Sequence, residues 1–255
     1  MEFLSSNYLQ TTTQLVVNSN TFTAQYVLSD DLTRQYVSDG FNNDLTTTTI
    51  TVNFDETTSI DRIAFMGHNL KEFTIFYNGA TANTFSITGP TTVSSFATNS
   101  TTSLYLQMAT PVAVTSVTFD LKSTIVANSE KAVGQILLAA NQLTFSRLPS
   151  ADAFSPVIIA KELTHVLSTG GTRRHVIDKK WDVKIKFKFI DQDFRDDLKA
   201  IYDLNQPVTF VPFGTTTAWD GIIFEANWTG NFDFYKYSDD AVGAGFSGQI
   251  ALKET

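Results

Sequence analysis

Short apolar runs separated by polar turn residues fill the first 145 residues of the chain. Between Asn18 and Leu143 the runs are six to ten residues long and cover 49–54, 60–67, 71–79, 102–108, 113–122 and 133–139. The Asn78-Gly79 pair is a strong tight-turn signal, and Pro111 ends a run. Because helical periodicity is missing and the runs have the length and spacing of strands, the pattern predicts a β-sandwich.

The most regular alternation in the chain lies in its second half, at residues 179–191. Apolar side chains occupy one face of the expected strand: Trp181, Val183, Ile185, Phe187 and Phe189. Charged side chains occupy the other face: Asp182, Lys184, Lys186 and Lys188. A period of two predicts a strand with one buried face, while the other face is wet or docked.

One helix is predicted directly after this strand, at about residues 191–205. Its apolar positions fall at helical spacing: Phe194, Leu198, Ile201 and Tyr202. Asp191 or Asp193 can cap its start, and Pro207 prevents its continuation. Four further candidate strands follow at 208–214, 221–230, 232–237 and 245–254. The second half is therefore expected to be β-rich with one packed helix.

A segment with two prolines and small residues separates the halves. Pro149 and Pro156 frame it, which is typical of a linker or an extended crossover. We therefore expect a first domain at 1–145, a linker at 146–160 and a second domain at 161–255. The predicted fold class is all-β, with an N-terminal sandwich and a C-terminal β-sandwich that carries one packed helix.

Composition narrows the classes of function. The 255 residues include 21 Phe and are 42% hydrophobic, which is enough for packed cores, and their net charge of −8 argues against a nucleic-acid partner. The absence of cysteine excludes disulfides, thiolate metal sites and a cysteine nucleophile. No run approaches the roughly 20 apolar residues of a membrane span, and no secretion signal opens the chain. We expect a protein made in a cytoplasm, without membrane insertion.

The three lysines of the alternating strand, Lys184, Lys186 and Lys188, have three explanations. They could protect an exposed strand from unwanted pairing, or form a cationic face that meets an acidic surface of a neighbouring subunit. Nucleic-acid binding comes third, because no aromatic residues are interleaved on the lysine face.

Catalytic motifs are weak throughout the chain. None of His68, His165 and His175 has a partner at metal-ligand spacing, so each is expected to be structural. The acidic pairs 30–31, 196–197 and 239–240 are neighbours in sequence and are expected to be solvated, rather than to face each other as glycosidase carboxylates do. We expect no enzyme; an enzyme acting on polysaccharide is the third hypothesis for function. The Gly67-His68-Asn69 stretch is expected to be a turn between two strands.

The strand order of residues 20–140 resembles the discoidin (F5/8 type C) galactose-binding jelly roll. The resemblance is carried by the loop 27–39, by "TITVNFDETTSIDRIAFMGHNLKEFTIFYNG", by "VTSVTFDLK" and by "KAVGQILLA". It implies a jelly roll whose loops at one end bind sugar or calcium, which would place Asp30, Asp31 and Thr33 near a cation. Calcium is the one ion that the resemblance implies, and we expect no other cofactor. If sugar binds, Tyr36, Phe41 and Tyr77 are the aromatic candidates for stacking.

Residues 160–255 resemble the tail-tube-like β domain of distal tail and other baseplate proteins of long-tailed phages. "WDVKIKFKFIDQDFRDDLKAIYDLNQPVTFVPF" and "GFSGQIALKE" carry this resemblance, which implies rings around a tail tube. Our leading hypothesis is a structural virion protein of a phage tail, located in the tail tip or baseplate. It would form a homo-oligomeric ring through its C-terminal domain, with Lys184, Lys186 and Lys188 in the interface. Its jelly roll would face outward toward other tail proteins or a host-surface glycan. The alternative is a carbohydrate-binding module or receptor-binding protein without a ring-forming role.

Overall fold

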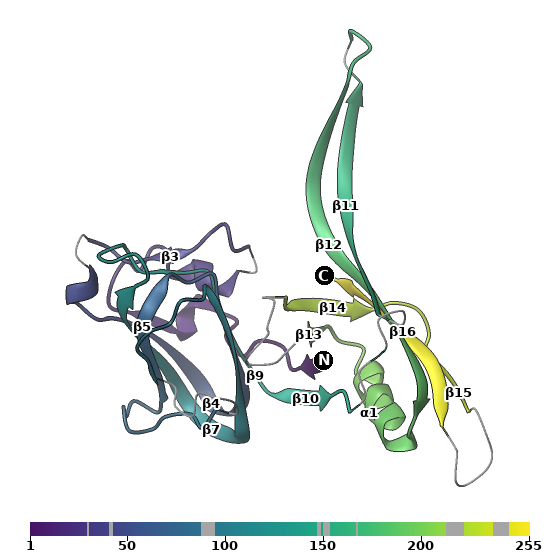
Figure 1. The fold of residues 1–255 in the computed structure, drawn as a ribbon, viewed down its shortest axis with the longest axis horizontal. Helices are drawn as coiled ribbons and strands as arrows, with labels where there is room; N and C mark the ends of the chain where they lie inside the picture. The colour runs from purple at the N-terminus through teal and green to yellow at the C-terminus, as the bar shows by residue number, and fades with distance from the viewer. Residues whose placement is uncertain are drawn as a thin grey trace. The chain divides into compact units, whose positions relative to one another are not determined.

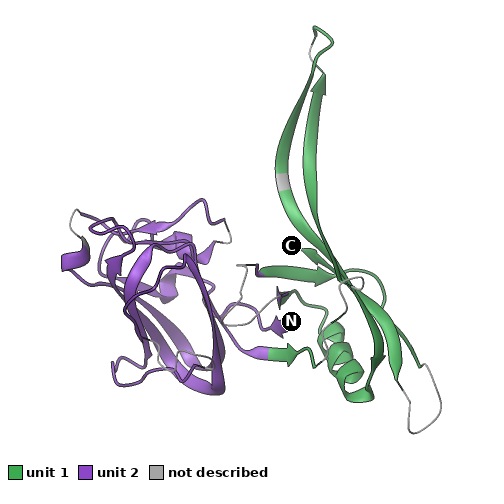
Figure 2. Cartoon of the chain, in the orientation of Figure 1, with its two compact units in different colours: residues 1, 142–210, 224–255 green, residues 2–141, 211–223 purple. Residues whose placement is uncertain are grey.

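The chain folds into two compact units built almost entirely of antiparallel strands. The computed structural model describes residues 1–29, 31–40, 43–87, 95–146, 149, 154–166, 168–212, 222–236 and 245–255 (Figure 1). Unit 1 comprises residues 1, 142–210 and 224–255, and unit 2 comprises residues 2–141 and 211–223 (Figure 2). Within the described ranges there is one α-helix, and the strand pairings within residues 15–139 and within residues 154–254 are antiparallel. The predicted all-β class with one packed helix is confirmed.

Unit 2 is organised around two long strands, β4 (Thr48–Met66) and β7 (Ser103–Thr124). Its larger sheet has the order β2-β4-β7-β5-β6, with β9 also paired to β4, and a second sheet pairs β3 with β8. The remaining strands are β1 (Glu2–Leu4), β2 (Leu15–Val17), β3 (Tyr36–Val37), β5 (Leu70–Tyr77), β6 (Ser95–Phe96), β8 (Ala132–Val133) and β9 (Gln135–Ala139). Short 3-10 helices cover Thr12–Gln14, Ala24–Leu28 and Asn43–Leu45. The register of β4 on β7 shifts twice, at Asn53/Thr58 and Ile60/Arg62. Such shifts bend a strand pair, which lets one long ribbon contribute to a sandwich.

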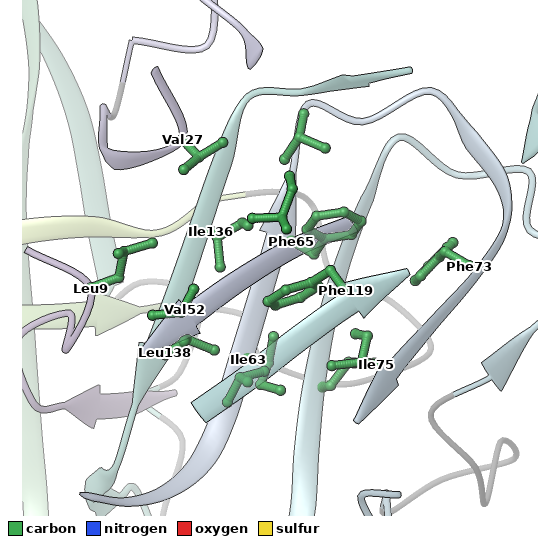
Figure 3. Packing of buried hydrophobic residues seen from close by; sticks show 14 of the residues in the cluster. Leu9, Val27, Val52, Ile63, Phe65, Phe73, Ile75, Phe119, Ile136 and Leu138 are labelled. Atoms are coloured by element: carbon green, nitrogen blue, oxygen red, sulfur yellow. The ribbon is translucent and has the colours of Figure 1, made fainter. Parts of the chain in front are cut away.

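The core of unit 2 follows the alternation of the sequence only in the first half of β4. There Ile50 and Val52 are buried while Thr49 and Thr51 are partly exposed. The second half, from Ile60 to Met66, is buried on both faces. Phe65 stacks on Phe119 with ring centroids 5.3 Å apart in the main core (Figure 3). Ala64 and Met66 belong to a second apolar cluster on the opposite face. A strand covered on both sides is expected to be continuously apolar, which explains the run "IAFM".

A buried ion pair crosses this second face and was not foreseen from the sequence. The Arg62 guanidinium donates two hydrogen bonds to the Glu2 carboxylate, from Nε at 2.8 Å and from one terminal nitrogen at 3.2 Å. Glu2 also accepts hydrogen bonds from the Tyr105 hydroxyl at 2.6 Å and the Gln107 amide at 2.7 Å. Burial, together with the Glu2 carboxylate, raises the pKa of Tyr105 well above its ordinary value. Four donors to one carboxylate offset the cost of its burial and fix β1 to the sandwich.

Unit 1 is a sheet with a helix on one face. The sheet runs β13-β14-β16-β12-β11, and β15 pairs with β16. Its elements are β10 (Asn141–Thr144), β11 (Phe154–Val166), β12 (Thr172–Ile190), α1 (Gln192–Asp203), β13 (Val208–Val211), β14 (Phe224–Trp228), β15 (Asp233–Lys236) and β16 (Phe246–Glu254). Part of the predicted linker, residues 154–160, forms the start of β11, where its backbone pairs with β12 from Phe154↔Ile185 onward. Residues 147, 148 and 150–153 lie outside the described residues.

Helix α1 is positioned by its cap and by three buried side chains. The Asp191 carboxylate accepts the Phe194 N–H at 2.8 Å, which satisfies one of the free donors at the start of the helix. Phe194, Leu198 and Ile201 are buried, and the Phe194 ring lies 5.8 Å from that of Phe187 on β12. In the part of the chain that the structure describes, no helix is long and apolar enough to cross a membrane.

Candidate assembly surface

A long hairpin projects from the sheet of unit 1 (Figure 1). It is formed by β11 and β12, which pair from Phe154↔Ile185 to Val166↔Thr172, with one register shift at Lys161/Glu162. We call residues 154–166 and 172–182 the arm. The described side chains are exposed at every position from 155 to 166 and from 172 to 177, so this part of the arm is covered on neither face by the described residues.

The arm exposes large apolar side chains on both of its faces. Val157, Ile159 and Leu163 alternate along β11 on one face and are 54%, 46% and 46% exposed. The other face carries Ile158 and Val166, which are also exposed. A two-stranded hairpin alone is at best marginally stable in water, and exposed apolar stripes of this kind mark interaction surfaces. The arm therefore has the composition of a surface that a partner covers.

The lysines of the alternating strand lie where the arm enters the sheet. Val183, Ile185 and Phe187 are buried on one face of β12, while Lys184, Lys186 and Lys188 are exposed on the other. We call these three lysines the Lys stripe. Across the described residues the Lys stripe makes no ion pair. A hollow of about 480 Å³ lies beside it, lined by Lys186, Lys188, Asn231, Asp233, Tyr235 and Gln249, among others.

The buried apolar face of β12 ends at Phe187, two residues earlier than the alternation predicts. The Phe189 side chain is about half exposed. Its φ of 59° lies in the left-handed region, which bulky residues such as phenylalanine rarely adopt. The register of β12 on β16 shifts between Phe187 and Ile190, so Ile190 takes the buried position. The strand thereby turns its last apolar side chain inward just before helix α1.

The aromatic candidates for sugar stacking lie mostly in the core of unit 2. Tyr36 is 0% exposed, its hydroxyl donates to the Ser19 carbonyl at 2.7 Å, and burial raises its pKa to about 12. Its ring therefore has no face open to a ligand. Tyr77 is partly buried, with its ring 4.9 Å from that of Phe85. Phe41 lies outside the described residues.

The loop proposed for calcium forms a local turn. The Asp31 carboxylate accepts the Thr33 N–H at 3.0 Å and the Thr33 hydroxyl at 2.5 Å, and these hydrogen bonds lower the pKa of Asp31. Asp30 lies outside the described residues. Among the residues that are described, no three His, Asp or Glu side chains gather as metal ligands.

His68 is a core residue. Its ring stacks on Phe65 with centroids 4.6 Å apart and meets Phe73 edge-on at 5.5 Å. Its Nδ1 accepts the Leu70 N–H at 3.2 Å, and burial lowers its pKa to about 4. The chain turns at this stretch. Gly67, with φ of 63°, is the residue in the left-handed conformation, and the Asn69 side-chain amide donates to the Glu130 carbonyl.

Sequence reasoning missed the residue that fixes the loops at one end of unit 2. The Asp44 carboxylate accepts three hydrogen bonds, from the N–H and hydroxyl of Thr124 and from the Asn128 N–H, at 2.9 to 3.0 Å. Burial opposes the ionised form, but these bonds and the charge of Lys131 outweigh it, so the pKa of Asp44 is lowered. The Lys131 ammonium is buried and donates to the Thr46 carbonyl at 2.8 Å. Only the tertiary structure brings positions 44 and 131 together.

An exposed aromatic ring lies elsewhere on unit 2. Phe22 is 78% exposed beside a hollow of about 550 Å³. The hollow is lined by Thr12, Leu15, Val16, Val17, Thr21, Phe22, Ala24 and Gln25. An exposed ring among hydroxyl and amide groups can contact a polar ligand that has an apolar face.

Comparisons with known proteins find similarities among solved structures. No protein-family model matches the chain, and no curated protein matches it. Chitosan-binding module 1, derived from a chitosanase/glucanase of Paenibacillus sp. IK-5, is 14% identical over 52% of this chain and 98% of that chain, with a TM-score of 0.38. The CpGH89CBM32-4 module of Clostridium perfringens, solved in complex with GlcNAc-α-1,4-galactose, is 13% identical over 53% and 96%, with a TM-score of 0.38. A structure with the CBM32-1, CBM32-2 and M60 catalytic domains of Clostridium perfringens ZmpB is 22% identical over 55% of this chain and 15% of that one, with a TM-score of 0.39. TM-scores this low leave the function to be argued from the geometry of the chain itself.

Proposed function

We propose that this protein is a structural protein that assembles through unit 1, with its arm lying on a neighbouring copy. The observation that carries the proposal is the arm, whose apolar side chains are exposed on both faces. We take a second copy of the chain as the partner, because other copies are present wherever the chain is made. The finer proposal is a ring in a phage tail, with unit 2 presented outward. It is supported by the resemblance of residues 160–255 to tail-tube-like domains.

The proposal is tested on the full chain with Val157→Thr, Ile159→Thr and Leu163→Thr combined. Threonine keeps the preference for strand conformation but removes the apolar surface of one arm face. Burial by a partner contributes roughly 1 kcal/mol for each of these half-exposed side chains, so the dissociation constant should rise roughly 100-fold. The matched control is Leu45→Thr with Val126→Thr, two exposed apolar positions on unit 2.

The measurement is the mass in solution by light scattering and sedimentation over a range of concentrations. We expect the parent chain and the control to exceed the 28.2 kDa of one chain, and the arm variant to dissociate. A parent chain that stays monomeric up to about 0.5 mM would refute assembly through the arm.

Carbohydrate binding by unit 2 is the second candidate function. The specific observation is Phe22, whose exposed ring lies beside the hydroxyl and amide groups of Thr12, Thr21 and Gln25. A pyranose ring presents C–H groups to an aromatic face and hydroxyls to such neighbours. In a glycan screen of the full chain, Phe22→Ala should abolish saturable binding, while Leu45→Ala should not. Absence of saturable binding by the parent chain would eliminate this function.

A further inference from the structure

The sheet of unit 1 presents opposite charges on its two sides. Side chains alternate across β12, so the Lys stripe lies on the face opposite Phe187. Helix α1 packs against the Phe187 face, since the Phe194 ring lies 5.8 Å from the Phe187 ring. The helix therefore forms the outer layer on one side, and the lysines form the surface of the other.

The helix carries two acidic side chains that make no ion pair with the described residues. Asp193 and Asp197 are exposed, lie one turn apart on one flank of α1, and make no ion pair among the described residues. The other exposed acids of the helix differ in this respect. Asp196 contacts Arg195 at 2.5 Å, and Asp203 contacts Lys199 at 2.5 Å. Two like charges four residues apart destabilise a helix slightly, so the pair has a cost that a cationic partner would remove.

The spacing of the two charge pairs matches. Alternate residues on a strand, such as Lys186 and Lys188, are about 6.6 Å apart. Residues four apart on a helix, such as Asp193 and Asp197, are about 6 Å apart along its axis. Two lysines of one copy can therefore meet two aspartates of another copy at the same time.

We propose that Lys186 and Lys188 of one copy bind Asp193 and Asp197 of the next copy in a head-to-tail contact. The inference rests on the proposed assembly and specifies its interface. The contact joins two different surfaces, so repeating it closes a ring when the rotation between copies allows. Other charges share the lysine face. Lys184 extends the stripe, and Asp182 precedes it on the same face, opposite Lys253. Asp233 lies two strands away from Lys186, because both pair with Gln249. Their backbones are about 10 Å apart across two strand spacings, and Asp233 makes no ion pair with the Lys stripe among the described residues.

The test uses two charge-reversed full-length variants. The first combines Lys186→Glu and Lys188→Glu, which makes both surfaces acidic. The second combines Asp193→Lys and Asp197→Lys, which makes both surfaces basic. Each variant alone should have the mass of one chain, 28.2 kDa, in sedimentation at low salt. The equimolar mixture should regain the mass of the parent assembly, because each variant then supplies the surface that the other lacks.

The controls separate this inference from the proposed function. Lys71→Glu with Lys122→Glu makes the same change in net charge on unit 2 and should leave assembly unchanged. Misfolding of a variant is detected by circular dichroism and cannot be repaired by mixing. If the parent chain assembles and both reversed variants still assemble alone, the head-to-tail contact is refuted while assembly through the arm stands. If the variants dissociate and their mixture stays monomeric, the pairing of these two surfaces is refuted. A monomeric parent chain refutes both.

Discussion

Replacing His68 by phenylalanine should remove a large part of the pH dependence of the stability of unit 2. His68 lies between Phe65 and Phe73, and its Nδ1 accepts the Leu70 N–H. The site therefore favours the neutral imidazole over the protonated imidazolium. Burial lowers the pKa of His68 from 6.5 to about 4. Phenylalanine keeps an aromatic ring there and cannot be protonated.

The sign and magnitude follow from these two pKa values. Between about pH 6.5 and pH 4 the unfolded chain binds a proton at this residue that the native protein does not bind. The stability that depends on neutral His68 is therefore fully present above the pKa of the unfolded chain. It is lost as the pH falls toward the pKa of the folded protein. Between pH 7 and pH 4.5 the free energy of unfolding should fall by about 2 kcal/mol from His68 alone.

The assay is urea unfolding followed by pulse-labelling hydrogen exchange and mass spectrometry. Peptides from β5 and β9 report on unit 2, and peptides from β16 report on unit 1 as an internal reference. Carboxylates also titrate in acid, so the informative quantity is the difference in pH dependence between the parent chain and His68→Phe. The variant also loses an acceptor for the Leu70 N–H, but that loss is the same at every pH. His175→Gln, on the exposed arm, is the control. If the parent and His68→Phe lose stability in parallel between pH 7 and pH 4.5, His68 is not a buried neutral residue.

Two further predictions concern the polar contacts of unit 2. Glu2→Gln removes one carboxylate from the buried Arg62 guanidinium and leaves Asp61, 3.4 Å away, as its charged partner. The loss of charge-assisted hydrogen bonds should lower the free energy of unfolding by about 2–3 kcal/mol in the same urea assay. A loss below about 1 kcal/mol would show that the pair of Arg62 with Glu2 is solvated. Asp44→Asn weakens the three hydrogen bonds from Thr124 and Asn128, and should cost about 1.5–3 kcal/mol at pH 7. Because the pKa of Asp44 is lowered, its contribution to the free energy of unfolding is present above the unfolded pKa and is lost in acid. The stabilities of the parent chain and Asp44→Asn should therefore converge as the pH falls through the folded pKa. A difference that stays constant with pH would contradict the ionised contact.

The sequence by itself determined the elements whose patterns depend on local chemistry. Alternation along β12 separated Val183, Ile185 and Phe187 from the Lys stripe, because successive side chains of a strand point to opposite faces. The apolar spacing after Asp191 located helix α1, and its cap and the later Pro207 set its limits. Asn78 and Gly79 both adopt positive φ at the predicted turn.

Only the tertiary structure decided which side chains are accessible and which distant residues meet. Tyr36 and Phe22 are both aromatic, yet one is fully buried and the other is exposed. Their burial depends on neighbours far along the chain. The contacts of Glu2 with Arg62 and of Asp44 with Thr124 join residues 60 and 80 positions apart, which no periodicity encodes. The sequence analysis placed residues 154–160, the start of the arm, in a linker, and only the structure shows a paired strand there whose side chains are almost all exposed. Alternation specifies which side chains share a face, but whether that face is covered depends on the packing of other segments and other molecules.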